Sequence, residues 1–381
     1  MEQSKRLGLY IHIPFCRSKC LYCDFCSLPG CDGETVEAYV GALCRDLEAW
    51  SEKCKDYTVD TVYLGGGTPT YLHARQLERI MRTVWERYRI SPDAEITSEC
   101  NPATGDGETF RQMRAMGFNR LSIGLQSAHE RELRALGRIH TFEDFCRTFR
   151  DARRAGFENL SVDLMSGIPE QTAASWGETL QSVLSLAPEH ISAYGLIIEE
   201  GTPFAKQEKS LSIPDEEIAE KMYFAGIETL ESHGVFQYEI SNFARKGYES
   251  RHNLKYWSCE EYLGFGPSAY SDFAGERFGN SRDVMAYIAG KEITAERECP
   301  DLGERIKEYL MLRLRLCEGL ESVAMRERFG VTPEALCGKT IERQLRLGFL
   351  QKTDRGYAFT REGFYVSNTL LSELLDFSLE S

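Results

Sequence analysis

Short apolar runs rich in β-branched residues alternate with longer amphipathic stretches through the first two thirds of the chain. The apolar runs predict strands at 8–13, 61–64, 94–98, 120–125, 159–165 and 190–196. The amphipathic stretches predict helices at 35–53, 77–88, 107–116, 141–155 and 174–186. Six successive strand–helix units predict an α/β fold with a parallel sheet and right-handed crossovers, curled into a partial or full barrel.

The pattern changes after about residue 295 and becomes mostly helical. Helices are predicted at 302–316, 320–329 and 333–347, followed by two short alternating strands at 348–352 and 356–360 and a last helix. Three helices followed by a two-stranded wing predict a winged-helix-like domain at 296–381, after a larger domain at 1–295. Such modules often bind DNA, but the acidic character of the chain favours a packing or docking role.

The composition limits the partners of the chain. Its 381 residues are 42% hydrophobic and 27% charged, with a net charge of -14. This charge argues against a nucleic-acid partner, because phosphate binding depends on clustered Lys and Arg. We find no apolar run with a cleavage site near the N-terminus and no stretch as long as a membrane span, so we expect a cytoplasmic protein. In that compartment the 13 cysteines are expected to be thiols or metal ligands.

Three cysteines near the N-terminus form a compact cluster. Cys16, Cys20 and Cys23 have the spacing Cys-x3-Cys-x2-Cys. Three thiolates on one loop can hold a [4Fe-4S] cluster and leave one iron without a protein ligand. A structural zinc site is one alternative, because Cys26 lies close enough in sequence to act as a fourth ligand. Unligated thiols are another.

A glycine run, Gly65-Gly66-Gly67-Thr68-Pro69, directly follows the second predicted strand. Consecutive glycines let the backbone approach a ligand and present N–H groups to it, and Thr68 adds a hydroxyl. A tight strand-to-helix turn is the alternative. The position after a strand favours a ligand site.

Polar side chains lie at or just beyond the ends of the following predicted strands. They are Glu99, Gln126, Arg138 and Asp163. Because the carboxyl ends of parallel strands meet at one edge, we expect these side chains to share one site with the cysteines. For Arg138 a surface salt bridge is the alternative. Asp163 lies inside an apolar run and therefore needs a cation or several hydrogen-bond donors.

His252 is flanked by aromatic residues and follows the end of the predicted barrel pattern. A lone histidine is usually an imidazole with satisfied hydrogen bonds. An aromatic-flanked histidine is also typical of an axial heme ligand.

Together, these motifs resemble the oxygen-independent coproporphyrinogen oxidase group of radical S-adenosylmethionine (SAM) proteins, over nearly the whole chain. The matching segments are YIHIPFCRSKCLYC at 10–23, GGGTP at 65–69, SECNP at 98–102, SIGLQS at 122–127, GRIH at 137–140, DLMSGIP at 163–169, YEISNFA at 238–244, HNLKYW at 252–257 and GFGPSA at 264–269. The resemblance implies a partial (β/α)6 radical SAM barrel followed by the winged-helix-like domain.

Within this group the chain is most similar to the heme chaperone branch. Only fifteen residues precede Cys16, whereas the true dehydrogenases of the group carry a longer N-terminal extension. Asp24 and Phe25 follow Cys23, in place of the Cys-Gly-Cys pattern of the dehydrogenases. The motif that begins at His252 is similar to one associated with heme binding in the chaperone branch.

The resemblance also implies a role for each matching residue. Cys16, Cys20 and Cys23 would ligate the [4Fe-4S] cluster, and SAM would chelate its open iron. Tyr10 and Tyr22 would line SAM, Gly66, Gly67 and Thr68 would bind its amino-acid end, and Glu99 would hold a ribose hydroxyl. Gln126, Arg138 and Asp163 match positions that contact a second SAM in the dehydrogenases, and His252 would bind heme.

The implied function is that of a heme chaperone, which binds heme, a [4Fe-4S] cluster and SAM and transfers heme to acceptors such as membrane respiratory enzymes. An electron donor is a further expected partner. The first alternative is a coproporphyrinogen III dehydrogenase, and the second is a heme-degrading radical SAM methyltransferase. The resemblance leaves open whether the chain is an enzyme.

Overall fold

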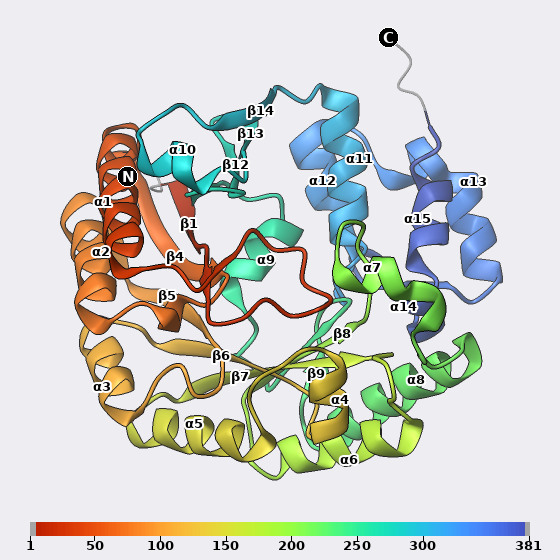
Figure 1. Cartoon of the computed structure of the whole chain (residues 1–381). Helices are drawn as coiled ribbons and strands as arrows, with labels where there is room; N and C mark the ends of the chain where they lie inside the picture. The colour runs from red at the N-terminus through yellow and green to blue at the C-terminus, as the bar shows by residue number, and fades with distance from the viewer. Residues whose placement is uncertain (1–4, 378–381) are drawn as a thin grey trace.

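The computed structural model describes residues 5–377. Six parallel strands form the centre of its main sheet, in sequence order (Figure 1). They are β1 (Lys5–Ile13), β4 (Tyr57–Gly66), β5 (Ile90–Cys100), β6 (Arg120–Gln126), β7 (Asn159–Ser166) and β8 (His190–Gly195). Each overlaps a predicted strand, and the predicted parallel, barrel-like fold is confirmed.

Helices join these strands and cover the outer face of the curled sheet (Figure 1). They are α1 (Gly33–Ser51), α2 (Ala74–Arg87), α3 (Gly107–Ala115), α5 (Phe142–Arg154) and α6 (Ala173–Leu184). The short helix α4 (Glu130–Ala135) instead contacts the loops that follow β6 and β7. α5 begins at a capping box in which Thr141 and Asp144 each accept a backbone N–H of the other. Its apolar face buries Phe145 and Phe149 in the core shared with the sheet. Short 3-10 turns occupy Glu52–Cys54, Pro69–Tyr71 and Glu208–Ser210.

Short strands beyond residue 200 extend both edges of the six-stranded centre. β10 (Asn242–Ala244) pairs antiparallel with β8 and with β9 (Phe236–Gln237). On the other edge, β11 (Tyr262–Phe265) runs parallel to β1. The remaining elements of this extension are α7 (Pro203–Gln207), α8 (Glu216–Ser232), α9 (Arg251–Trp257), β12 (Tyr270–Phe273), β13 (Glu276–Asn280), α10 (Val284–Ile288) and β14 (Thr294–Glu298). β1 is therefore an internal strand of the sheet, bonded on both sides.

The C-terminal part has its own small sheet and its own apolar core, which includes Ile306, Leu310 and Phe359. Its elements are α11 (Leu302–Arg313), β15 (Leu320–Glu321), α12 (Ser322–Phe329), α13 (Pro333–Arg346), β16 (Leu350–Lys352), β17 (Gly356–Phe359), α14 (Arg361–Tyr365) and α15 (Ser367–Leu374). Three helices and a hairpin agree with the predicted winged-helix-like arrangement. The domain division at 295 and 296 stays a prediction, and β14 crosses it.

No helix within residues 5–377 is both long and apolar enough to cross a lipid bilayer.

Candidate functional site

A cavity of about 330 Å³ lies at the carboxyl ends of the parallel strands. It is lined by all but two of the site residues predicted from the sequence: Cys16, Cys20, Tyr22, Cys23, Gly66, Gly67, Thr68, Glu99, Gln126, Arg138 and Asp163. These residues come from segments far apart in the chain, and the shared strand edge brings them together, as parallel strands require. Tyr10 and His252 do not line the cavity.

The three cysteines lie on the loop that follows β1, where β2 (Phe15–Cys16) pairs with β3 (Leu28–Pro29). Cys16 Sγ is 3.4 Å from Thr68 Oγ1, and Arg138 Nη1 donates to Cys20 Sγ at 3.4 Å. Burial raises the pKa of Cys23 to about 11. A metal bound at Cys23 would therefore have to displace the proton of this thiol. Among residues 5–377, no three His, Cys, Asp or Glu side chains surround a single-ion position.

Cys26 points away from the other three cysteines. Its thiol faces the carbonyl oxygen of Arg282 at 3.5 Å, and its own carbonyl accepts a hydrogen bond from His12 Nε2 at 2.9 Å. Because Nε2 is the donor, Nδ1 of His12 accepts from the Tyr10 hydroxyl at 3.1 Å. Asp24 forms a two-point ion pair with Arg282, with oxygen–nitrogen distances of 3.1 and 2.6 Å. The cysteine loop is thus tied to the segment before α10, and Cys26 is used in that attachment.

The glycine run packs against the cysteine loop. A Cβ on Gly66 would lie 2.4 Å from the His12 ring, and one on Gly67 would lie 2.7 Å from the Phe15 carbonyl oxygen. The N–H groups of Gly67 and Thr68 donate to carbonyls of the loop at 2.9 and 2.8 Å. The expectation that this run presents free N–H groups to a ligand is therefore wrong. Close packing of two backbones uses the donors and excludes side chains.

Glu99 is a buried carboxyl on the cavity wall. Its two oxygens accept from the Tyr63 hydroxyl and the Gly66 N–H, both at 3.0 Å. Burial raises the pKa of Glu99 to about 7, and the neighbouring Asp163 charge adds to the shift. Near neutral pH the side chain can therefore accept or donate a hydrogen bond.

Arg138 and Asp163 have defined protein partners on the cavity wall. Arg138 Nη2 donates to Asn101 Oδ1 at 2.8 Å and to the Gly124 carbonyl at 2.6 Å. Asp163 accepts from the Ser122 hydroxyl at 2.9 Å, and burial raises its pKa. The surface salt-bridge alternative for Arg138 is wrong, because its charged group is enclosed at the strand ends.

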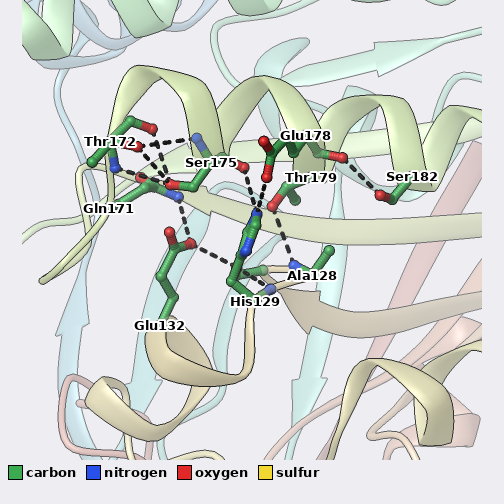
Figure 2. Close-up of polar contacts among 10 residues, drawn as sticks. Ala128, His129, Glu132, Gln171, Thr172, Ser175, Glu178, Thr179 and Ser182 are labelled. Carbon is green, nitrogen blue, oxygen red and sulfur yellow. Dashed lines mark hydrogen bonds and ion pairs between the residues drawn. The ribbon is translucent and has the colours of Figure 1, made fainter.

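Gln126, in contrast, has an unsatisfied oxygen. Its Oε1 is buried without a hydrogen-bond partner, and its backbone φ of 71° is in the left-handed region. The loop behind it is held by α4, because Ser127 donates to the buried Glu132 at 2.6 Å. Figure 2 shows Glu132 meeting Gln171 of the loop after β7, at 3.4 Å. The same view shows His129 beside Glu178 of α6, at 3.3 Å. These contacts hold the loop that follows Gln126 against α4 and α6.

His252 lies on α9, which follows the barrel strands in the sequence and packs against β4. Its Nδ1 is 2.8 Å from Thr61 Oγ1, its Nε2 is 2.7 Å from the Tyr256 hydroxyl, and its ring stacks on Tyr63. Burial lowers the pKa of His252 to about 3, so the ring is neutral. Only 1% of the His252 surface is exposed to solvent. It could bind a metal only by giving up one of these two hydrogen bonds.

Comparison with known proteins identifies the family. Residues 10–183 match the radical SAM superfamily, and residues 301–366 match the HemN C-terminal domain. The chain is 35% identical to the heme chaperone HemW of Bacillus subtilis, over 96% of this chain and 98% of that protein. The chain belongs to the HemW family of radical SAM proteins. It is also 35% identical to the mouse mitochondrial radical S-adenosyl methionine domain-containing protein 1, over 98% of this chain and 88% of that protein.

A solved structure agrees with the fold of this HemW family member. Coproporphyrinogen III oxidase (HemN) from Escherichia coli superposes with a TM-score of 0.85 at 23% identity. The match covers 98% of this chain and 90% of that one. At this identity the likeness concerns the fold alone.

Several cavity residues of this HemW family member were not predicted from the sequence. They include Tyr63, Asn101, Arg120, Ser122, Ser192 and Tyr194. A signal for two of them was present. Arg120 and Ser122 lie on β6 at the alternate positions that lead to Gln126, so all three face the same side of the sheet.

Proposed function

We propose that this chain is a heme chaperone that binds heme, a [4Fe-4S] cluster and SAM and passes heme to acceptor proteins such as membrane respiratory enzymes. The observation that carries the proposal is the similarity to HemW heme chaperones along nearly the whole chain. The cavity supports it, because cysteine thiols, a buried carboxyl and two arginines line the same space. An electron donor is a further partner in this proposal.

The cluster ligands in this proposal are Cys16, Cys20 and Cys23. The donor set fits, because soft thiols open onto the cavity while Cys26 is turned to another contact. A bound cluster supplies one electron at a time to its ligand. The protein would exclude water around it, and Arg138, which donates to Cys20, would stabilise the thiolate charge.

The same cavity offers polar groups for SAM. In this proposal Tyr22, Gly66, Gly67, Thr68 and Glu99, which line the cavity with the cysteines, would contact SAM. The unsatisfied Gln126 oxygen can accept from an amine or hydroxyl of a bound molecule. With Arg138 and Asp163 it would form a second SAM contact region.

Heme binding at His252 requires its ring to leave the Tyr256 hydroxyl or Thr61. His252→Ala should therefore abolish tight heme binding in an absorbance titration. Tyr256→Phe removes the competing hydrogen bond at Nε2 and keeps the packing of the ring, so it should bind heme about 5-fold more tightly. If His252→Ala binds and transfers heme as well as the wild type, His252 is not the ligand.

The decisive experiment uses anaerobically purified protein with iron and sulfide analysis, followed by heme titration with and without the cluster. Iron and sulfide in equal amounts support the cluster, whereas zinc alone would contradict it. Heme binding followed by transfer to an apo-acceptor supports the chaperone. Incubation with coproporphyrinogen III, SAM and a reductant is the control, and protoporphyrinogen would show a dehydrogenase. SAM-dependent loss of added heme would show a heme-degrading enzyme.

A further inference from the structure

Arg120 lies on the floor of the cavity and has unused hydrogen-bond donors. It is the first residue of β6, and only 2% of it is exposed. Its Nε is buried without a partner, and within residues 5–377 we find no hydrogen bond from its guanidinium group. A guanidinium carries five donors, and leaving buried donors unpaired is costly. The cavity is the place from which an acceptor can reach this group.

Glu99 and Asp163, two carboxyls that line the same cavity, do not use these donors. The positive charge of Arg120 opposes the rise in the pKa of both Glu99 and Asp163. The oxygens of Glu99, however, accept from Tyr63 and Gly66, and Asp163 accepts from Ser122. Arg120 therefore balances charge at a distance while its N–H groups remain available.

The other guanidinium on the cavity wall shows the contrast. Arg138 donates to a side-chain oxygen, a carbonyl and a thiol of the protein, so its terminal nitrogens are occupied. The terminal nitrogens of Arg120 make no such hydrogen bonds within residues 5–377. The path to Arg120 starts at side chains that reach solvent, since Phe25 is 66% and Tyr194 is 40% exposed and both line the cavity.

We propose that Arg120 binds a carboxylate of the molecule that enters this cavity. Its planar fork matches the two oxygens of a carboxylate, which can accept two parallel hydrogen bonds. Two sources carry such a group: a propionate side chain of a tetrapyrrole and the methionyl carboxylate of SAM. The heme arm rests on the proposed function, whereas the SAM arm rests only on the chemistry of the family.

The test compares ligands with and without the carboxylate on the full-length, anaerobically reconstituted protein. One pair is heme and heme dimethyl ester, and the other is SAM and decarboxylated SAM. The affinity ratio within each pair is measured for the wild type and for Arg120→Gln. In the pair whose carboxylate Arg120 binds, the ratio should fall by about 10- to 100-fold in the variant. The pair that responds identifies the source.

Arg17→Gln is the matched control, because it removes the same charge from an exposed position of the cysteine loop that does not line the cavity. Its ratios should equal those of the wild type. Arg120→Lys keeps the charge without the planar fork, so its affinity ratio should lie between those of the wild type and Arg120→Gln. This variant replaces Arg120→Gln in the test if Arg120→Gln fails to fold. Equal ratios in Arg120 variants and wild type for both pairs would overturn the proposal, as would a wild type with no preference for either carboxylate. Failure of heme binding alone would remove the proposed function but leave the SAM pair decisive.

Discussion

Replacing Glu99 with glutamine should flatten the pH dependence of folding stability. The pKa of Glu99 rises from 4.5 to about 7 in the folded protein, first because of burial and then because of the Asp163 charge. Between these values the folded state keeps a proton that the unfolded state has lost. The free energy of unfolding therefore falls as pH rises through this window. At about 1.4 kcal/mol per pKa unit, the loss attributable to Glu99 is about 3 kcal/mol.

Glutamine suits this test because it keeps both hydrogen bonds. Its oxygen can accept from the Gly66 N–H while its amide donates to the Tyr63 hydroxyl, which can also act as an acceptor. Urea unfolding of the apoprotein at about pH 5 and about pH 8 measures the difference. Other carboxyls with raised pKa values, such as Asp46 and Glu239, titrate in both proteins and cancel.

The wild type should lose about 3 kcal/mol more than Glu99→Gln between the two pH values. Relief of Asp163 from the neighbouring charge acts in the same direction. If both proteins lose the same stability, Glu99 does not titrate in this window and the reasoning fails.

Three further predictions follow from the contacts. Cys16→Ser should lose the iron and the visible absorbance of the reconstituted protein, whereas Cys26→Ser should keep both; loss in both variants would make Cys26 a ligand. Gly67→Ala should lower the free energy of unfolding by about 2 kcal/mol, because its Cβ meets backbone atoms at 2.7 Å. Its control Gly177→Ala has open space and lies in a helix, so it should be neutral or stabilising in the same urea experiment. Lys255→Met should lower the free energy of unfolding by about 3 kcal/mol or more, as measured by thermal unfolding. It leaves Asp60 and Glu260, which Lys255 Nζ contacts at 2.9 and 2.8 Å, without their cation. Unchanged stability would mean that these charges are already well hydrated.

The parallel strands could be predicted because each contains a short run rich in apolar and β-branched residues, and amphipathic helices separate successive runs. Strands such as β10 and β11 could not, because they are short and gain their stability from pairing with β8 and β1, which lie far away in the sequence. α4 has only six residues, too few for a helical pattern of apolar positions to be recognised in the sequence.

The cavity residues that lie at strand ends could be predicted, because the topology of a parallel sheet alone brings side chains such as Glu99 and Asp163 to one edge. Arg120 begins its strand, and a charge at that position is more typical of a solvent-exposed end. Its alternation with Ser122 and Gln126 indicates the face of the sheet, but only three-dimensional packing shows that its long side chain reaches the cavity. The contacts of His252 could not be predicted, because no pattern in the sequence indicates that α9 packs against β4.

The position of β1 between β4 and β11 affects how the protein is made. The cysteine loop leaves the ribosome long before residues 262–265, so one edge of β1 stays unpaired while most of the barrel is being synthesised. An unpaired apolar strand edge invites pairing with other chains. Nascent chains truncated before β11 should therefore be more prone to aggregation than chains that include it. The loop gains its fixed contacts with the segment before α10 only after that segment has emerged, so its final conformation is a late event in biogenesis.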